Sequence, residues 1–158
     1  MTSRSVQVRR ATSDDVEALL ALMRDFYAES GFALDPASAG AALRSLLASP
    51  SLGCIWLAFA DDVAVGHAVL TVRFTMEHEG LSGYVDDLYV RPTHRRQGIA
   101  RSLLGELLAE CRARQCNALH VEVGGSNSAA LALYAELGLR ASTDGRILAS
   151  GPVAGVGV

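Results

Sequence analysis

Positive charge is concentrated between residues 91 and 104, RPTHRRQGIARSLL, although the whole chain carries a net charge of −3. Arg95 and Arg96 come shortly before Gly98, and an apolar pattern at helical spacing follows the glycine. The first amides of a helix lack internal partners, so a glycine turn lets a phosphate approach them. Arginines add charge-assisted hydrogen bonds. This chemistry predicts a pyrophosphate-binding turn, although solvated surface arginines beside a helix start explain the turn alone equally well.

Two other phosphate-binding loops do not fit this stretch. A Walker loop needs Lys and then Ser or Thr after its final glycine, and the dinucleotide fingerprint needs G-x-G-x-x-G. Neither spacing occurs around Gly98.

Two carboxylates, Asp86 and Asp87, stand in the segment YVDDLYV, residues 84–90, just before the basic turn. A carboxylate placed there can bind an amine or accept its proton. Successive side chains of a regular strand point to opposite faces, so the two acids are not expected to line one slot. Asp86 then shares its face with Leu88 and Val90. A strand-end acid paired with a nearby arginine is the alternative reading of Asp86.

Alternating and helical patterns around these residues predict one mixed α/β domain. Strands are expected at residues 6–12, 54–60, 63–74, 84–90 and 118–123. Helices are expected at residues 13–30, 35–50, 98–113 and 127–137. The remaining expectations are a polar loop at residues 75–83, a weak hairpin around Asp144 and Gly145, and a poorly ordered tail at residues 150–158.

Composition narrows the function classes. Half of the 158 residues are hydrophobic and 20% are charged, which is typical of a globular domain. The negative net charge argues against nucleic-acid binding, and no stretch approaches the roughly 20 apolar residues of a membrane span. The N-terminus lacks the apolar core of a signal peptide, and three cysteines without paired spacing fit a reducing, cytoplasmic location. The four histidines lack zinc-ligand spacing, so no metal is expected.

Two spaced motifs resemble those of the GNAT superfamily of N-acetyltransferases. The loop pattern [QR]-x-x-G-x-[GA] is matched at Arg95, Gly98 and Ala100. The second pattern, N-x-x-A-x-x-x-Y-x-x-x-G, is matched by Asn127, Ala130, Tyr134 and Gly138. The resemblance covers nearly the whole chain and implies a single domain over residues 1–158, with a mostly antiparallel central sheet flanked by helices. The stretch YVDDLYVRP is most similar to the diamine and thialysine acetyltransferase branch.

The resemblance implies acetyl-CoA as co-substrate. Loop amides would hold its pyrophosphate, and the edge of the strand before the loop would pair with its pantetheine arm. An amide at Leu88 or Tyr89 would polarise the acetyl carbonyl. The family's frequent glycine is Arg96 here, whose amide can still donate provided that its φ is ordinary. The residues expected to bind acetyl-CoA are Leu88, Tyr89, Val90, Arg95, Arg96, Gln97, Gly98, Ile99, Ala100, Arg101, Asn127 and Ala130.

The implied reaction is acyl transfer to an amine, which must lose a proton to attack. Tyr134 matches the family's general acid, which would protonate the leaving thiolate; a tyrosine of the core is the alternative for it. Asp86 matches the acid that relays the proton or binds the amine. Glu122, expected on the neighbouring strand, is a further candidate base.

The acceptor is expected between the first two helices and the loop after the third strand. Its predicted contacts are Tyr27, Glu29, Asp87 and Glu122, and acids there suit a cationic small molecule such as a polyamine or an amino-acid-like amine. A solvated acidic face is the alternative. Three other functions stay open: acetylation of a protein N-terminus or lysine, acetylation of an aminoglycoside, and a non-catalytic CoA-binding sensor. Family members often dimerise, so a homodimer is expected.

Overall fold

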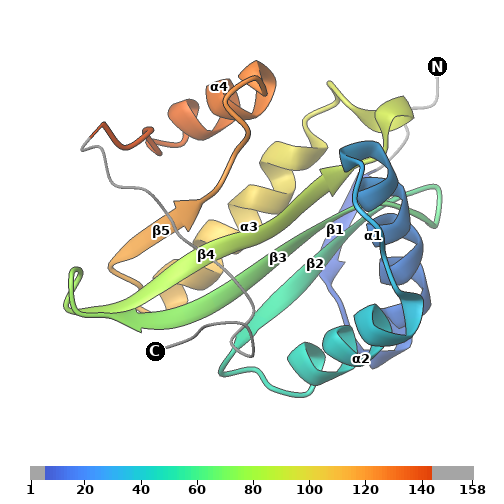
Figure 1. The fold of residues 1–158 in the computed structure, drawn as a ribbon, viewed down its shortest axis with the longest axis horizontal. Coiled ribbons are helices and arrows are strands. Elements are labelled where there is room, and N and C mark those ends of the chain that lie inside the picture. The colour runs from blue at the N-terminus through green and yellow to red at the C-terminus, as the bar shows by residue number, and fades with distance from the viewer. Residues whose placement is uncertain (1–5, 144–158) are drawn as a thin grey trace, which may run out of the picture. The chain divides into compact units, whose positions relative to one another are not determined.

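Five strands form one sheet within residues 6–143, the part of the chain that the computed structural model describes (Figure 1). The strands are β1 (Val6–Arg10), β2 (Gly53–Ala60), β3 (Val63–Thr75), β4 (Gly80–Val90) and β5 (Ala118–Val121), and they are arranged in chain order. Neighbouring strands are antiparallel except β4 and β5, which are parallel. The predicted mixed α/β fold with a mostly antiparallel sheet is confirmed.

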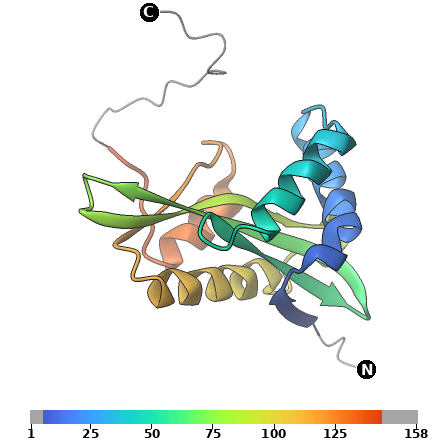
Figure 2. The ribbon, with the colours of Figure 1, turned by 90° about the horizontal axis from the view of Figure 1, so that it is seen from below.

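Helices cover both faces of the sheet (Figure 2). The helices α1 (Val16–Ser30) and α2 (Pro36–Leu47) lie on one face, and α3 (Ile99–Ala113) lies on the other. On the α1 face, Leu19 and Leu22 are completely buried in one cluster with Leu57 of β2. On the opposite face, the stripe predicted for α3 is buried at Leu103 and Leu107. Each such leucine stabilises the fold by about 1.5–3 kcal/mol, so the sheet is a firm support for the residues at its ends.

The predicted polar loop at residues 75–83 is wrong for most of its length. β3 and β4 both continue into it, and only residues 76–79 form the turn. In the sequence, Gly83 suggests a loop. In the structure, packing requires a glycine at this strand position, because a Cβ there would lie 2.7 Å from Sγ of Cys111 on α3. Ser82 is completely buried, and its hydroxyl lies 2.8 Å from a threonine hydroxyl of β3. The missing side chain at Gly83 therefore lets α3 lie close to the strand.

The chain divides into two compact units, the first ending at Gly124 and the second beginning at Gly125. The second unit contains α4 (Ser128–Glu136), close to its predicted bounds. Two short 3₁₀ turns, Ser13–Asp15 and Pro92–His94, precede α1 and the basic turn. A single domain over residues 1–158 stays a prediction. The expected hairpin around Asp144 and the tail at 150–158 lie outside the described residues.

Candidate active site

Asp86 is the extra residue of a bulge in β4. Val85 and Asp87 lie opposite two consecutive residues of β3, so Asp86 has no counterpart in the register. A bulge interrupts the alternation of side chains. The expectation that the two acids point to opposite faces was made for a regular strand, a condition that the bulge removes. Both approach Tyr27 of α1, where burial and then the charges of Asp87 and Asp86 raise the pKa of the phenol.

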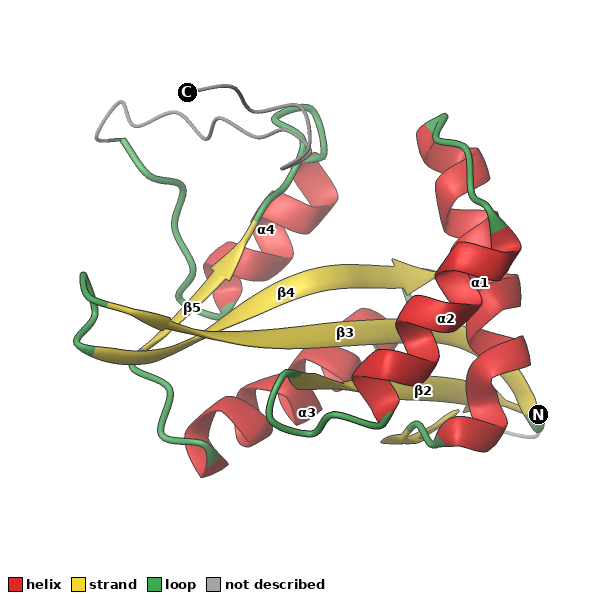
Figure 3. Cartoon of the chain, turned by 60° about the horizontal axis from the view of Figure 1, so that its bottom comes forward, coloured by secondary structure: helices red, strands yellow, loops and turns green. Residues whose placement is uncertain are grey.

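β4 and β5 stay paired only as far as this bulge. Their parallel register runs from Ser82 opposite Ala118 to Val85 opposite Val121. Beyond it, β4 keeps its partner β3, but no described strand pairs with its other edge. β5 ends at this point, and Figure 3 shows its arrow directed away from the continuing strand β4. Leu88, Tyr89 and Val90 therefore offer some of their main-chain groups at an open edge, as an extended ligand requires.

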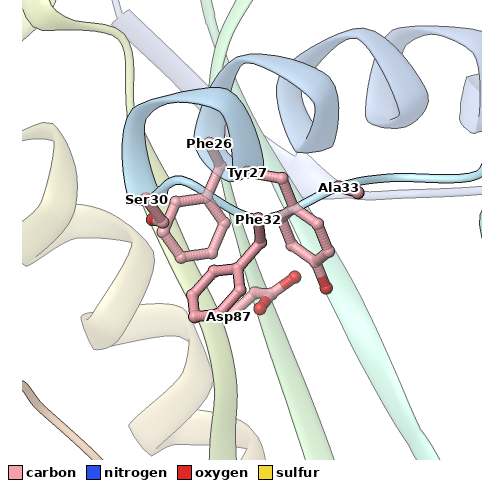
Figure 4. A pocket seen from close by; sticks show the side chains of 6 residues that line it. All are labelled: Phe26, Tyr27, Ser30, Phe32, Ala33 and Asp87. Carbon is pink, nitrogen blue, oxygen red and sulfur yellow. The ribbon is translucent and has the colours of Figure 1, made fainter.

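A recess of about 380 Å³ lies between the C-terminal end of α1 and β4. It is lined by Phe26, Tyr27, Ser30, Phe32, Ala33 and Asp87. Figure 4 shows the carboxylate of Asp87 among the aromatic rings. We call this recess the aromatic pocket. It contains two of the residues predicted to bind the acceptor, Tyr27 and Asp87, and aromatic faces beside a carboxylate suit a cation.

A third carboxylate, Glu122, lies just beyond the end of β5. Asp86 stays accessible to solvent on one side, yet burial by the surrounding protein, followed by the charges of Asp87 and Glu122, raises the pKa of its carboxyl. Burial and a hydrogen bond with Glu122 raise the pKa of Tyr84 to about 12. We call Asp86, Asp87 and Glu122 the acidic cluster. The two neighbouring negative charges disfavour ionisation of Asp86, and a bound cation would offset them.

Glu29, which is predicted to bind the acceptor, forms an ion pair with Arg95 of the basic turn. Its two carboxylate oxygens lie 2.8 and 2.7 Å from Nη2 of Arg95. The hydrogen bond from Arg95 lowers the pKa of Glu29. A second ion pair joins Asp25 to Nε of Arg91 at 2.9 Å. The acids on this side of α1 therefore hold the helix to the segment that follows β4, and Arg91 is more than a solvated surface residue.

Residues 95–101, which we call the anion loop, turn sharply into α3. Gly98 is its N-cap with a φ of +80°, and Arg96 has a φ of +63°. The condition of an ordinary φ at Arg96 is therefore not met: the left-handed conformation is kept although the residue is not glycine. Arg95 donates from Nε to the main-chain oxygen of Val90 at 2.8 Å, and its guanidinium lies 5.7 Å from the centre of the Tyr89 ring.

The second unit holds the other motif. Asn127 is the N-cap of α4, and its Oδ1 accepts a hydrogen bond from the amide of Ala130 at 3.1 Å. This contact caps the start of α4, and it leaves the side-chain amino group of Asn127 as the one suited to donate to a ligand. Tyr134 is buried, and burial raises the pKa of its phenol.

The sequence profile of the Acetyltransferase (GNAT) family matches residues 17–139, which is well over half of the chain. The chain belongs to the GNAT family. Membership supports an acyl-transferring enzyme that uses acetyl-CoA. The matched residues include the acidic pair, the anion loop and the second motif.

Part of this GNAT protein is similar to [Ribosomal protein bS18]-alanine N-acetyltransferase of Escherichia coli K12, with 42% identity over 57 residues. That match spans 36% of this chain and only 38% of the curated relative. Integron cassette protein HFX_CASS3 from the Cole Harbour Salt Marsh metagenome is 38% identical, with a TM-score of 0.82 over 93% of this chain and 90% of that one. Aminoglycoside N-acetyltransferase AAC(6′)-Iy, in complex with CoA, shares the fold at a TM-score of 0.81, with 15% identity over 96% of this chain and 97% of that one.

The anion loop of this GNAT protein fits a pyrophosphate. A Cβ added at Gly98 would meet no atom within 4 Å, so the loop is open above the glycine. No side chain caps α3, and its first amides lack partners within the helix. Within residues 6–143, no group of three or more His, Cys, Asp or Glu side chains is placed to hold a metal ion. In the same span, no helix is long and apolar enough to cross a membrane.

Sequence reasoning missed several residues of this site. Phe26 and Phe32 line the aromatic pocket, but one belongs to a helical pattern and the other follows the helix end at Gly31. The signal available in the sequence was an aromatic residue, Phe32, directly after the helix-ending Gly31; in the structure the Phe32 side chain is 71% exposed. Tyr84 was read only as a strand residue, and its contact with Glu122 depends on the parallel pairing of β4 with β5.

Proposed function

We propose that this protein is an acetyl-CoA-dependent N-acetyltransferase whose acceptor is a small, cationic primary amine. The observation that carries the proposal is the acidic cluster, which gathers Asp86, Asp87 and Glu122 at the open edge of β4, beside the aromatic pocket. A bound ammonium group relieves the repulsion between these carboxylates. The acidic pair is also what favours an acceptor of the diamine or thialysine kind.

Acetyl-CoA supplies the acetyl group as an activated thioester. The anion loop would receive its pyrophosphate at the uncapped start of α3, with charge from Arg95 and Arg96. The open edge of β4 at Leu88, Tyr89 and Val90 would pair with the pantetheine arm. The amino group of Asn127 is available for a further hydrogen bond. An amide at Leu88 or Tyr89 would stabilise negative charge on the acetyl oxygen.

The acceptor must be neutral to attack, whereas an alkyl amine resembles lysine, with a pKa of about 10.4. Asp86 would accept its proton, because the raised pKa of this carboxyl makes its ionised form a stronger base than an ordinary aspartate. Glu122 is the second candidate for that role. Tyr134 would protonate the leaving thiolate; since burial raises the pKa of its phenol, it acts mainly by donating a hydrogen bond, with proton transfer late.

The aromatic pocket would hold the acceptor through Asp87 and the faces of Phe26, Tyr27 and Phe32. A cation over an aromatic ring is stabilised by about 0.5–2 kcal/mol, depending on desolvation. A carboxylate beside those rings adds charge complementarity. Both effects favour an acceptor that carries a second, positively charged group over an acceptor with the reacting amine alone.

A peptide N-terminus is the second candidate acceptor. Its support is the local likeness to the bS18-alanine N-acetyltransferase, which acts on a protein. The likeness in fold to an aminoglycoside N-acetyltransferase keeps a polycationic sugar among the candidates as well. We further propose a homodimer in the cytoplasm; sedimentation of the whole chain tests the dimer.

Thiol release from acetyl-CoA over a panel of acceptors tests the proposal. The panel comprises alkyl diamines, lysine-like amino acids, an aminoglycoside and a peptide that begins with alanine. We expect turnover with diamines or amino acids, and a loss of most of that rate in Tyr134→Phe. Turnover with the peptide alone would move the assignment to the second candidate. CoA binding without turnover would indicate a sensor, and no CoA binding by calorimetry would refute the proposal.

A further inference from the structure

His67 of β3 is a buried polar side chain that the proposed chemistry does not use. It is 1% exposed, and neither ring nitrogen has a hydrogen-bond partner among the described residues. Buried polar side chains nearly always have such partners. Its ring stands 6.4 Å from that of Phe26 and 6.2 Å from that of Tyr89, centre to centre, so neighbouring rings confine it.

One polar atom lies just beyond the reach of this imidazole. Nε2 of His67 is 3.7 Å from Oδ2 of Asp87, which lines the aromatic pocket. That distance is too long for a hydrogen bond, and it is too short for a bridging water, which needs two bonds of about 2.8 Å. The side chain of Asp87 is itself mostly buried, at 14% exposure. A small rotation of the carboxylate would close the gap.

We infer that His67 is a positioning residue of the acceptor site: its Nε2–H donates to Oδ2 of Asp87 and turns Oδ1 toward the ammonium group of the acceptor. The inference rests on the proposed amine acetyltransferase function. Hydrogen bonds at active sites are often long without substrate and tighten when it binds. No proton moves in this step. The donor is Nε2–H, present in one neutral tautomer and in the imidazolium.

His67 could instead only fill space in the core. Three substitutions separate this filling role from the positioning role. His67→Leu keeps most of the volume but removes both nitrogens. His67→Gln can place an amide donor near the position of Nε2, whereas His67→Asn reaches only the position of Nδ1. A positioning role needs the donor at Nε2, so Gln should restore what Asn and Leu lose. A filling role predicts that all three variants differ only in melting temperature.

The experiment measures kcat and KM for the best acceptor of the diamine and amino-acid panel, together with KM for acetyl-CoA and the melting temperature. We expect His67→Leu and His67→Asn to raise the acceptor KM about tenfold, as loss of a hydrogen bond to a charged group does. The KM for acetyl-CoA should stay within about twofold of the wild type, and His67→Gln should recover most of the loss. In an Asp87→Asn background, His67→Leu should have little further effect, because the two residues act as one unit.

Two results would overturn the inference. The first is an equal acceptor KM in the Gln and Asn variants, which remains measurable if the Leu variant does not fold. The second is an equal effect of His67→Leu on the acceptor KM in the wild-type background and in the Asp87→Asn background. Failure of the proposed function is distinct, because the wild type would then acetylate no amine of the panel. In that case, calorimetry measures the binding of 1,4-diaminobutane to the wild type, His67→Gln and His67→Asn. The positioning role is refuted if the three proteins bind the diamine with equal affinity, or if the wild type does not bind it.

Discussion

Nη2 of Arg95 lies 2.8 and 2.7 Å from the two carboxylate oxygens of Glu29, so the anion loop is tied to the end of α1. The same guanidinium donates from Nε to the main chain of Val90, at the end of β4. One arginine thus joins the helix beside the acceptor pocket to the strand and loop proposed to hold CoA. A pyrophosphate that uses the charge of Arg95 has to share it with Glu29.

The first prediction follows from this shared arginine. Arg95→Ala should weaken CoA binding about tenfold, because it removes a charge-assisted contact of roughly 1.5 kcal/mol. Glu29→Gln should leave CoA affinity unchanged or raise it, because it removes the competing carboxylate. Both side chains are more than 40% exposed, so neither change should alter the melting temperature much. Calorimetry with CoA checks the affinities, and weaker binding in Glu29→Gln would show that the pair organises the loop instead.

Gly98 should matter more for CoA affinity than Arg91. A Cβ at this glycine meets no protein atom, but its φ of +80° is unfavourable for valine, and the side chain would occupy the space a pyrophosphate needs. Gly98→Val should therefore abolish measurable CoA binding, whereas Arg91→Ala should only loosen the contact with Asp25. Gly98→Ala is the matched control for the backbone effect. Similar affinities for Gly98→Val and Arg91→Ala would mean that the turn does not bind the ligand.

Arg96 carries strain that glycine would relieve. A left-handed φ of +63° costs a non-glycine residue on the order of 1 kcal/mol. Arg96→Gly should therefore be more stable than Arg96→Ala by about 1 kcal/mol, although both variants lack the guanidinium. Urea unfolding of the two variants measures the difference. Equal stabilities would indicate that the turn adopts another conformation in solution.

The pH dependence of Asp86 follows from its raised pKa. A carboxyl whose folded pKa lies above its unfolded value of 3.8 favours folding below that value, and this contribution is lost as the pH rises through the folded pKa. Asp86→Asn should thus raise the melting temperature at neutral pH and lose this advantage in acid. If Asp86 is the base, the variant should also lose the acidic limb of the profile of kcat/KM against pH. A retained limb would assign the base to Glu122.

Local patterns in the sequence were enough to predict most of the framework. The apolar pattern that follows Gly98 at helical spacing predicted α3, and Gly98 itself predicted an open, basic turn. The bulge at Asp86 was not predictable, because it depends on how β4 pairs with β3. Gly83 was mistaken for a loop residue because its reason is the close approach of α3.

The acceptor side was the harder part to predict. Glu29 is predicted to bind the acceptor, and the sequence does not show that Arg95 also reaches it. The aromatic pocket combines α1, the residues after it and Asp87 of β4, which are about 60 residues apart in the chain. Contacts of that kind arise from tertiary packing, which helical and strand periodicities do not predict.

Recognition of a cationic acceptor by the aromatic pocket is best tested with two acceptors of equal length that differ in one charge. These are an alkyl diamine and the amino alcohol in which a hydroxyl replaces the second amine. The measurement is kcat/KM for thiol release from acetyl-CoA, in the wild type and in Asp87→Asn. We expect at least a tenfold preference for the diamine, corresponding to about 1.4 kcal/mol, and loss of that preference in the variant. Equal rates for the two acceptors in the wild type would contradict recognition of a second positive charge by Asp87.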